Sequence, residues 1–118
     1  MRNQPKYNFF KNTSYALDGL KDLVTTETSF KIELFLAVIL LPVIIFLDLS
    51  LVNKALLFIS LMGILIAEAI NSAIERVVDL VTLKHHHMAK RAKDIGSSIV
   101  FLSIFVFIVI WASILFCN

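Results

Sequence analysis

The chain has 118 residues, of which 58% are hydrophobic and 17% are charged, and its net charge is +2. This length allows one domain at most, and the excess of apolar over charged residues excludes an ordinary soluble domain. Cys117 is the single cysteine, so an internal disulfide is also excluded. We therefore expect an all-α integral membrane protein in which residues 1–118 form a single membrane domain.

An amphipathic surface helix is predicted at about residues 6–26. Its charged residues lie off the helical face that its apolar residues share. The apolar residues on this face are Phe10, Leu17, Leu20 and Val24. This pattern favours a helix in the membrane interface and, equally, a helix packed on the spans through the same face; the two are compatible. The polar residues 25–29 then predict a turn or a new helix start.

Three apolar runs predict transmembrane helices at about residues 30–48, 53–81 and 91–117. The last run contains 23 residues without a charge, enough to cross the hydrocarbon core as a helix. The second reaches that length only when Glu68 and Asn71 are included in the span. The predicted architecture is therefore three spanning helices preceded by a surface helix.

Short polar segments connect the predicted spans. We expect a turn at 48–53 and a loop at 82–90, with Arg91 beginning the last helix. Pro42 lies inside the first span, where a kink is tolerated if neighbouring groups satisfy the freed carbonyl. Residues 1–33 are polar and lack an early apolar core followed by a cleavage site, so we expect a retained span and no signal peptide.

The basic residues predict the orientation of the spans. Of eleven Lys and Arg residues, five precede residue 34 and five lie within 75–94, whereas Lys54 alone lies between the first two spans. Basic residues concentrate on the cytoplasmic side of membrane proteins. The N-terminus and the 75–94 segment are therefore predicted to be cytoplasmic, and the C-terminus to lie outside.

Four polar residues fall on one face of the second predicted span: Glu68, Asn71, Glu75 and Asp79. At about 100° per residue, Glu75 lies roughly 20° from Glu68 around the helix, and Asp79 lies roughly 20° to its other side. Ionisable groups are costly within a membrane and mark functional sites there. We call these four residues the acidic stripe.

The acidic stripe is compatible with several kinds of chemistry. A carboxylate in apolar surroundings suits a general base, and clustered carboxylates with an amide oxygen suit Mg²⁺ bound together with substrate phosphates. Lys93 and Asp94 follow the basic loop and are placed to close the far side of such a site. Polar residues that hold helices together, or that line a path for ions, remain open alternatives.

Other common nucleotide and metal signatures are absent. Glycine occurs only at positions 19, 63 and 96, so neither glycine-rich phosphate-binding motif can be formed. Three adjacent histidines, 85–87, cannot all face one metal ion and are interpreted as a solvated loop. Trp111 is expected to pack or anchor the last span at the outer interface.

Two segments resemble the prokaryotic diacylglycerol kinase family: EAINSAIERVVD (68–79) and HMAKRAKDIGSS (87–98). Residues 15–33 resemble it more loosely. The resemblance implies a homotrimeric kinase of the bacterial inner membrane, with each site shared between neighbouring subunits and no nucleic-acid partner. Such a kinase transfers the γ-phosphoryl group of MgATP to diacylglycerol, giving phosphatidic acid.

The resemblance also implies roles for individual residues. Glu68 would be the general base, and Glu27 and Glu75 would hold Mg²⁺. The residues implied to contact or support the nucleotide are Tyr15, Asn71, Glu75, Asp79, His86, Lys93 and Asp94. Those implied to lie at the lipid substrate are Glu33, Glu68 and Ser97.

Two positions depart from the family pattern. Asn8 stands where a nucleotide-contacting arginine is expected, and Lys90 stands where a small residue is expected. A lysine at position 90 resembles the pattern of the undecaprenol kinases of the same family, which phosphorylate a polyprenol. Diacylglycerol is thus the first expected substrate and undecaprenol the second, while a non-enzymatic proton- or ion-conducting subunit is the alternative outside this class.

Overall fold

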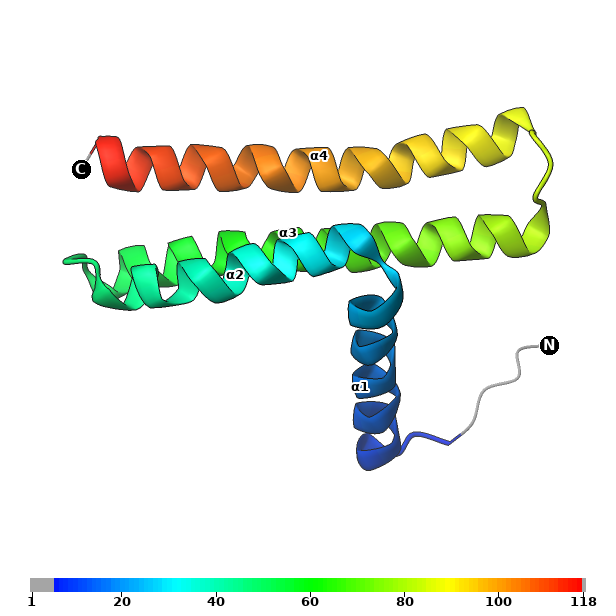
Figure 1. Ribbon diagram of the computed structural model, residues 1–118, viewed down its shortest axis with the longest axis horizontal. Coiled ribbons are helices and arrows are strands. Elements are labelled where there is room, and N and C mark those ends of the chain that lie inside the picture. The colour runs from blue at the N-terminus through cyan, green and yellow to red at the C-terminus, as the bar shows by residue number, and fades with distance from the viewer. Residues whose placement is uncertain (1–5, 118) are drawn as a thin grey trace.

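The computed structural model describes residues 6–117, which form four helices and no strand (Figure 1). The helices are α1 (Phe9–Thr26), α2 (Thr28–Phe46), α3 (Leu51–Val81) and α4 (His87–Phe116). The last three are long and apolar enough to cross a membrane. The predicted all-α fold with three spanning helices is confirmed.

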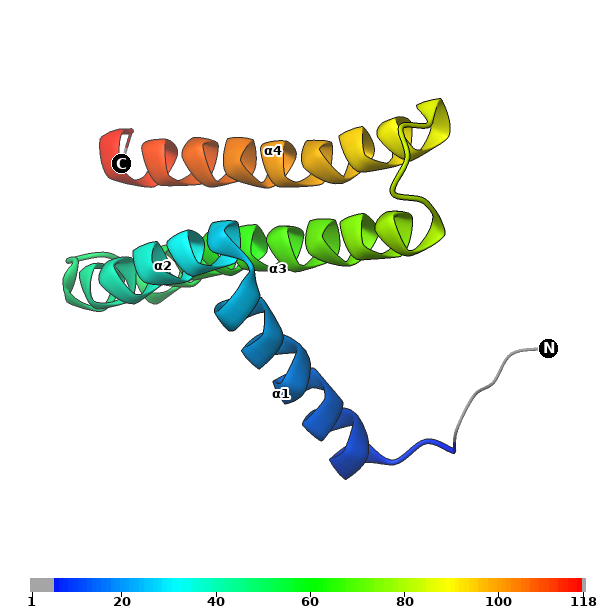
Figure 2. The same ribbon diagram turned by 45° about the vertical axis from the view of Figure 1, so that its right-hand side comes forward.

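Helix α1 leaves the other helices at a steep angle (Figure 1 and Figure 2). It begins after Asn8, whose side-chain oxygen accepts a hydrogen bond from the Lys11 amide at 3.1 Å. The extended backbone of Glu27 then turns the chain into α2. Every residue of α1 except the half-buried Leu23 is exposed, which leaves its apolar face uncovered, as an interfacial helix requires.

The turn between α2 and α3 is short and well capped. Helix α2 continues through Pro42 to Phe46. The Ser50 hydroxyl accepts a hydrogen bond from the Asn53 amide at 3.1 Å, and α3 begins at Leu51, two residues before the expected start. The Lys54 ammonium donates to the Ile45 carbonyl at 2.7 Å and so ties the turn back to the end of α2.

Helix α3 is the centre of the bundle. It packs against α4 most extensively and against α2 on another face. Leu57, Leu61 and Leu65 recur every four residues and are buried. Their partners in the apolar core are Phe30, Ala37, Ile44 and Ile114. With 31 residues, α3 is about 46 Å long and must extend beyond a hydrocarbon core of about 30 Å.

Helices α3 and α4 are joined by a polar contact near the α2–α3 turn. The Trp111 indole donates a hydrogen bond to the Ser60 hydroxyl at 3.0 Å, and Ser60 donates to the Leu57 carbonyl. The Phe107 ring lies 5.0 Å from the Trp111 ring, centroid to centroid. Trp111 is therefore a packing residue, one of the two roles expected for it.

The start of α4 was wrong in the sequence-based prediction. The helix begins at His87 and not at Arg91, so the connecting loop is four residues shorter than expected. The reason is that the His86 ring nitrogen Nδ1 accepts a hydrogen bond from the Met88 amide at 3.1 Å and caps the helix. This early start brings Lys90 and Lys93 onto one rigid element facing the end of α3.

Candidate active site

The acidic stripe runs from the buried middle of α3 to its exposed end. Glu68 is buried, with 7% of its surface exposed, while Asn71 and Glu75 are half-buried and Asp79 is exposed. Eleven residues of helix place Glu68 and Asp79 about 16 Å apart along the axis. The stripe therefore links the interior of the apolar bundle with the charged end that bears the α3–α4 loop.

Three further carboxylates surround Glu68. Glu27 at the α1–α2 junction, Glu33 on α2 and Glu75 on α3 are all close enough to repel a negative charge on Glu68. The structure thus gathers around the predicted base both predicted metal ligands and the acid predicted to face the lipid. These four acids come from segments about 40 residues apart in the chain, and the α2–α3 packing brings them together.

Asn71 is held between Glu75 and α4. Its amide nitrogen donates to Glu75 Oε1 at 3.0 Å, while its Oδ1 is buried without a hydrogen-bond partner. Gly96 of α4 lies directly against that oxygen, since a Cβ at position 96 would overlap it. The close approach of α4 therefore fixes the orientation of Asn71 and, through it, one oxygen of Glu75.

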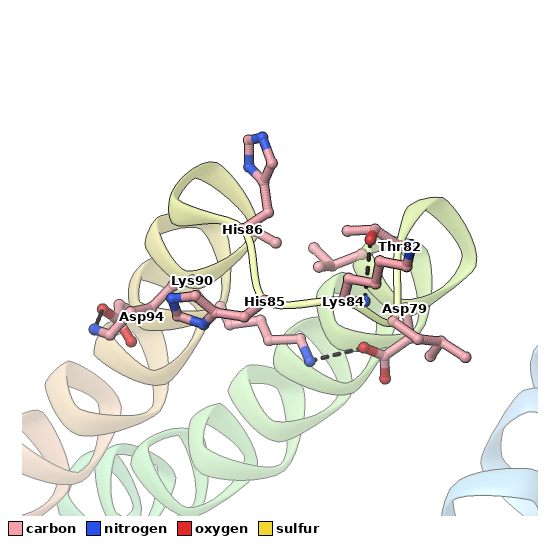
Figure 3. A pocket seen from close by; sticks show the side chains of 11 residues that line it. Asp79, Thr82, Lys84, His85, His86, Lys90 and Asp94 are labelled. Carbon is pink, nitrogen blue, oxygen red and sulfur yellow. Dashed lines mark hydrogen bonds and ion pairs between the residues drawn. The ribbon is translucent and has the colours of Figure 1, made fainter.

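The exposed end of the stripe opens into a pocket of about 480 Å³ between the ends of α3 and α4 (Figure 3). The Lys93 ammonium lies 2.7 Å from an Asp79 oxygen across the two helices, and the Lys90 ammonium lies 2.7 Å from Asp94. His86 lines the same pocket. The structure thus brings together four of the residues predicted at the nucleotide: Asp79, His86, Lys93 and Asp94.

Two of the predicted site residues lie apart from these clusters. Tyr15 is exposed on α1, in a separate hollow of about 300 Å³ that it shares with Asn8 and Lys11. Ser97 is exposed on α4 and lines none of the pockets described for residues 6–117. Within one chain, neither side chain contributes to the acid cluster or to the pocket at the end of α3.

Arg76 is a site residue that sequence reasoning missed. Its guanidinium is paired with Asp22, donates to Thr26 Oγ1 at 2.9 Å, and reaches Glu27 Oε1 through two nitrogens at 2.9 and 3.3 Å. The hydrogen bond from Arg76 holds the pKa of Asp22 below its ordinary value. Because these partners lie 49 to 54 residues away, only the position of Arg76 beside Glu75 hinted at a role.

The donor set fits a metal ion that arrives with phosphates. Among residues 6–117, no three acids, histidines or cysteines converge closely enough to hold a metal ion alone. Mg²⁺ in phosphoryl-transfer sites usually takes one or two carboxylates, and phosphate and water oxygens complete its shell. Glu27 and Glu75, the predicted metal ligands, both lie near Glu68 and would be such a pair of hard oxygen ligands. A closed, all-protein metal site does not fit.

Comparison with known proteins identifies the family. Residues 14–115 match the family model described as prokaryotic diacylglycerol kinase. The chain belongs to this family. It is 38% identical over 109 residues to the diacylglycerol kinase of Haemophilus influenzae, covering 92% of each chain. It is 41% identical over 103 residues to the diacylglycerol kinase of Pseudomonas aeruginosa, covering 87% of this chain and 84% of the relative.

Another relative carries a different name. The undecaprenol kinase of Bacillus subtilis is 35% identical over 92 residues, covering 78% of this chain and 75% of the relative. Both names describe kinases that act on a lipid alcohol, so membership of the family implies an ATP-dependent lipid kinase with a nucleotide substrate. The membrane-spanning helices of the structure agree with that membership.

Proposed function

We propose that this protein transfers the γ-phosphoryl group of MgATP to the free hydroxyl of diacylglycerol, giving phosphatidic acid. The observation that carries the proposal is the continuity of the acidic stripe. The stripe begins at a buried carboxylate, Glu68, in a helix apolar enough to cross a membrane, and leads over about 16 Å to a lysine-bearing pocket at the exposed end of the bundle. In this arrangement the lipid hydroxyl and the water-soluble nucleotide bind at opposite ends of one stripe on α3.

Glu68 acts as the general base in this proposal. It accepts the proton of the lipid hydroxyl while the hydroxyl oxygen attacks the γ-phosphorus, and ADP leaves with the electrons of the broken P–O bond. Burial of Glu68 excludes water that would otherwise compete for the phosphoryl group. Glu33 and Ser97 are assigned to the lipid side.

The nucleotide is assigned to the exposed half of the stripe. Lys93 is the cation for the phosphates, and Asn71, held by Glu75, positions the end of the polyphosphate nearest Glu68. Mg²⁺ held by Glu27 and Glu75 would offset phosphate charge during transfer. Four residues support the nucleotide around these groups: Tyr15, Asp79, His86 and Asp94.

We assign the active form to a homotrimer in the bacterial inner membrane, with the N-terminus and the 75–94 segment cytoplasmic and the C-terminus outside. Two features support shared sites. The α3–α4 pocket is partly open, and Tyr15 and Ser97 do not line it. The apolar side chains that α4 leaves exposed, such as Phe101 and Phe105, suit lipid or a neighbouring subunit.

A single assay tests the proposed activity. Purified protein in mixed micelles receives γ-³²P-labelled ATP, Mg²⁺ and a panel of lipid alcohols that includes diacylglycerol and undecaprenol. We expect label in phosphatidic acid, and a loss of at least about 100-fold in Glu68→Gln, because a general base contributes at least that much. Asp48→Asn, an acid outside the stripe, is the matched control and should keep full activity. Full lipid phosphorylation by Glu68→Gln would overturn the role of Glu68.

Undecaprenol is the second candidate acceptor. The similarity to the Bacillus subtilis undecaprenol kinase and the lysine at position 90 favour it, and Lys90 lies in the pocket at the end of α3, paired with Asp94. In the same assay, preferential labelling of undecaprenol would assign the protein to that acceptor. Ion flux in liposomes without any lipid phosphorylation would instead support a conducting subunit.

A further inference from the structure

Arg76 is a positively charged group in direct contact with Glu27, one of the two proposed metal ligands. Both of its contacts with Glu27 are made to the same oxygen, Oε1, at 2.9 and 3.3 Å. Within the part of the chain that the structure describes, Oε2 of Glu27 accepts no hydrogen bond. One oxygen of a proposed Mg²⁺ ligand is thus occupied by a fixed cation, while the other is free.

The surroundings explain why a cation is needed there. Glu27, Glu33 and Glu75 each lie close enough to Glu68 to repel a negative charge on it. Lys93 and Lys90 are paired with Asp79 and Asp94 at the far end of the stripe. Arg76 is therefore the group that offsets the charge of the acid cluster on the side of Glu27.

We propose that Arg76 is a counter-ion for Glu27. It pairs with Glu27 in the nucleotide-free protein, and this ion pair breaks when a divalent cation binds together with the nucleotide. This inference rests on the proposed function, since it takes Glu27 as a metal ligand. Arg76 acts through Glu27 and is a positioning residue. Its consequence is an order of binding: metal alone binds weakly, and metal with phosphates binds strongly.

The contacts of Arg76 suit such an exchange. The Arg76 and Glu27 side chains are 44% and 28% exposed, and solvent-exposed ion pairs are weak and screened by salt. Asp22 and Thr26 of α1 hold the same guanidinium. When Glu27 turns to a metal ion, Arg76 therefore keeps two partners and is not left as an unpaired charge.

The test measures binding of Mn²⁺, a paramagnetic substitute for Mg²⁺, to the nucleotide-free protein by the electron paramagnetic resonance signal of free Mn²⁺. We expect Arg76→Gln to bind Mn²⁺ roughly three- to tenfold more tightly than the unaltered chain, because a positive charge beside the ligand is removed. Asp22→Asn leaves Arg76 on Glu27 and removes a partner that would hold Arg76 after the exchange, so this variant should bind Mn²⁺ no more tightly than the unaltered chain. Arg91→Gln controls for loss of a positive charge elsewhere.

The double variant Arg76→Gln/Glu27→Gln shows whether the gain in Mn²⁺ affinity depends on Glu27. If it does, the double variant should bind Mn²⁺ no more tightly than the unaltered chain. Unchanged or weaker Mn²⁺ binding in Arg76→Gln, or an equal gain in Arg91→Gln, would overturn the proposal. Circular dichroism and elution volume verify that each variant keeps its helices and its assembly.

A second variant keeps the proposal testable if Arg76→Gln does not fold. Because Arg76 already occupies Glu27 without nucleotide, Glu27→Gln should change nucleotide-free Mn²⁺ affinity less than twofold. It should weaken Mn²⁺ binding at least about tenfold when a non-hydrolysable ATP analogue is present. If Glu27→Gln weakened Mn²⁺ binding equally with and without the ATP analogue, the proposed exchange would be contradicted.

Failure of the inference and failure of the proposed function give different results. If the unaltered chain phosphorylates lipid but Arg76→Gln shows no gain in Mn²⁺ affinity, only the counter-ion role is wrong. If the unaltered chain phosphorylates no lipid, the proposed function is wrong, whatever the Mn²⁺ binding shows.

Discussion

At Gly96 the backbone of α4 lies directly against the acidic stripe. An added Cβ would overlap Asn71 Oδ1 and would also lie 3.5 Å from the Ile74 side chain. Gly96→Ala must therefore displace Asn71 and break its 3.0 Å hydrogen bond to Glu75. We expect a loss of about 1–3 kcal/mol in stability from overpacking, and at least about a tenfold fall in lipid phosphorylation.

The matched control is the same substitution at Gly63, which lies on α3 with open space around it. Alanine is the better helix former, so Gly63→Ala should keep both stability and activity. Thermal unfolding in detergent and the labelled-ATP assay measure the two quantities. Equal behaviour of the two variants would show that the contact between Gly96 and Asn71 does not position the site.

The acidic stripe could be predicted from the sequence, whereas the contacts of Arg76 could not. The stripe follows from helical periodicity alone, because Glu68, Asn71, Glu75 and Asp79 share a face of any α-helix. The contacts of Arg76 with Asp22 and Glu27 do not follow, because they depend on how α1 and α2 fold back against α3. Periodicity reports positions on one helix and carries no information about a partner about 50 residues away.

Among the helices, α1 depends on charge for its attachment to α3. Arg76 holds Asp22 and Thr26 near the end of α1, and the apolar residues of α1 are largely exposed. The pKa of Asp22 is lowered from its ordinary value of 3.8, chiefly by the hydrogen bond from Arg76. A carboxyl with a lowered pKa stabilises the folded arrangement above its ordinary pKa, and this contribution is lost as the pH falls through the lower, folded value.

We therefore predict that the end of α1 loosens from α3 as the pH is lowered below 3.8, the ordinary pKa of Asp22. A spin label at position 17, in a chain whose Cys117 is replaced by serine, reports the mobility of α1 in detergent across this range. Asp22→Asn should show high label mobility already at neutral pH and a smaller change on acidification. An acid transition of the same size in Asp22→Asn would exclude Asp22 as its cause.

The two ends that flank the α3–α4 loop differ in how well the sequence predicted them. Helix α3 runs to Val81 and stops at Thr82, as expected from an apolar pattern without a breaker. Helix α4 begins four residues early because a histidine ring accepts the capping hydrogen bond, and histidine is not a usual N-cap residue. The shift matters, because it turns part of a supposed loop into a helix that presents Lys90 and Lys93 to one pocket.

At the scale of the molecule, one chain builds the acid cluster and the lysine pocket but leaves other assigned residues outside them. Tyr15 and Ser97 are exposed and do not line the pocket at the end of α3, and α4 exposes apolar side chains along its length. Length and hydropathy predict how many helices cross the membrane. They do not predict which copies of the chain lie side by side, because lipid and a neighbouring subunit cover an apolar face equally well.

Mixing two inactive variants tests the shared site directly. Glu68→Gln removes the proposed base and Lys93→Met removes the proposed phosphate-binding cation, so each pure variant should be inactive. Where the lysine pocket of one chain completes the site around Glu68 of a neighbour in a cyclic trimer, random reassembly of equal amounts leaves about a quarter of the sites intact, whereas the continuous stripe of a single chain predicts none. We expect no recovery if the stripe of one chain is one site, and about a quarter of the activity of the unaltered chain if Glu68 and Lys93 come from different subunits, measured by labelled-ATP transfer after dissociation and joint refolding. If both residues serve the site of their own chain, no mixture contains an intact site and the recovery is zero.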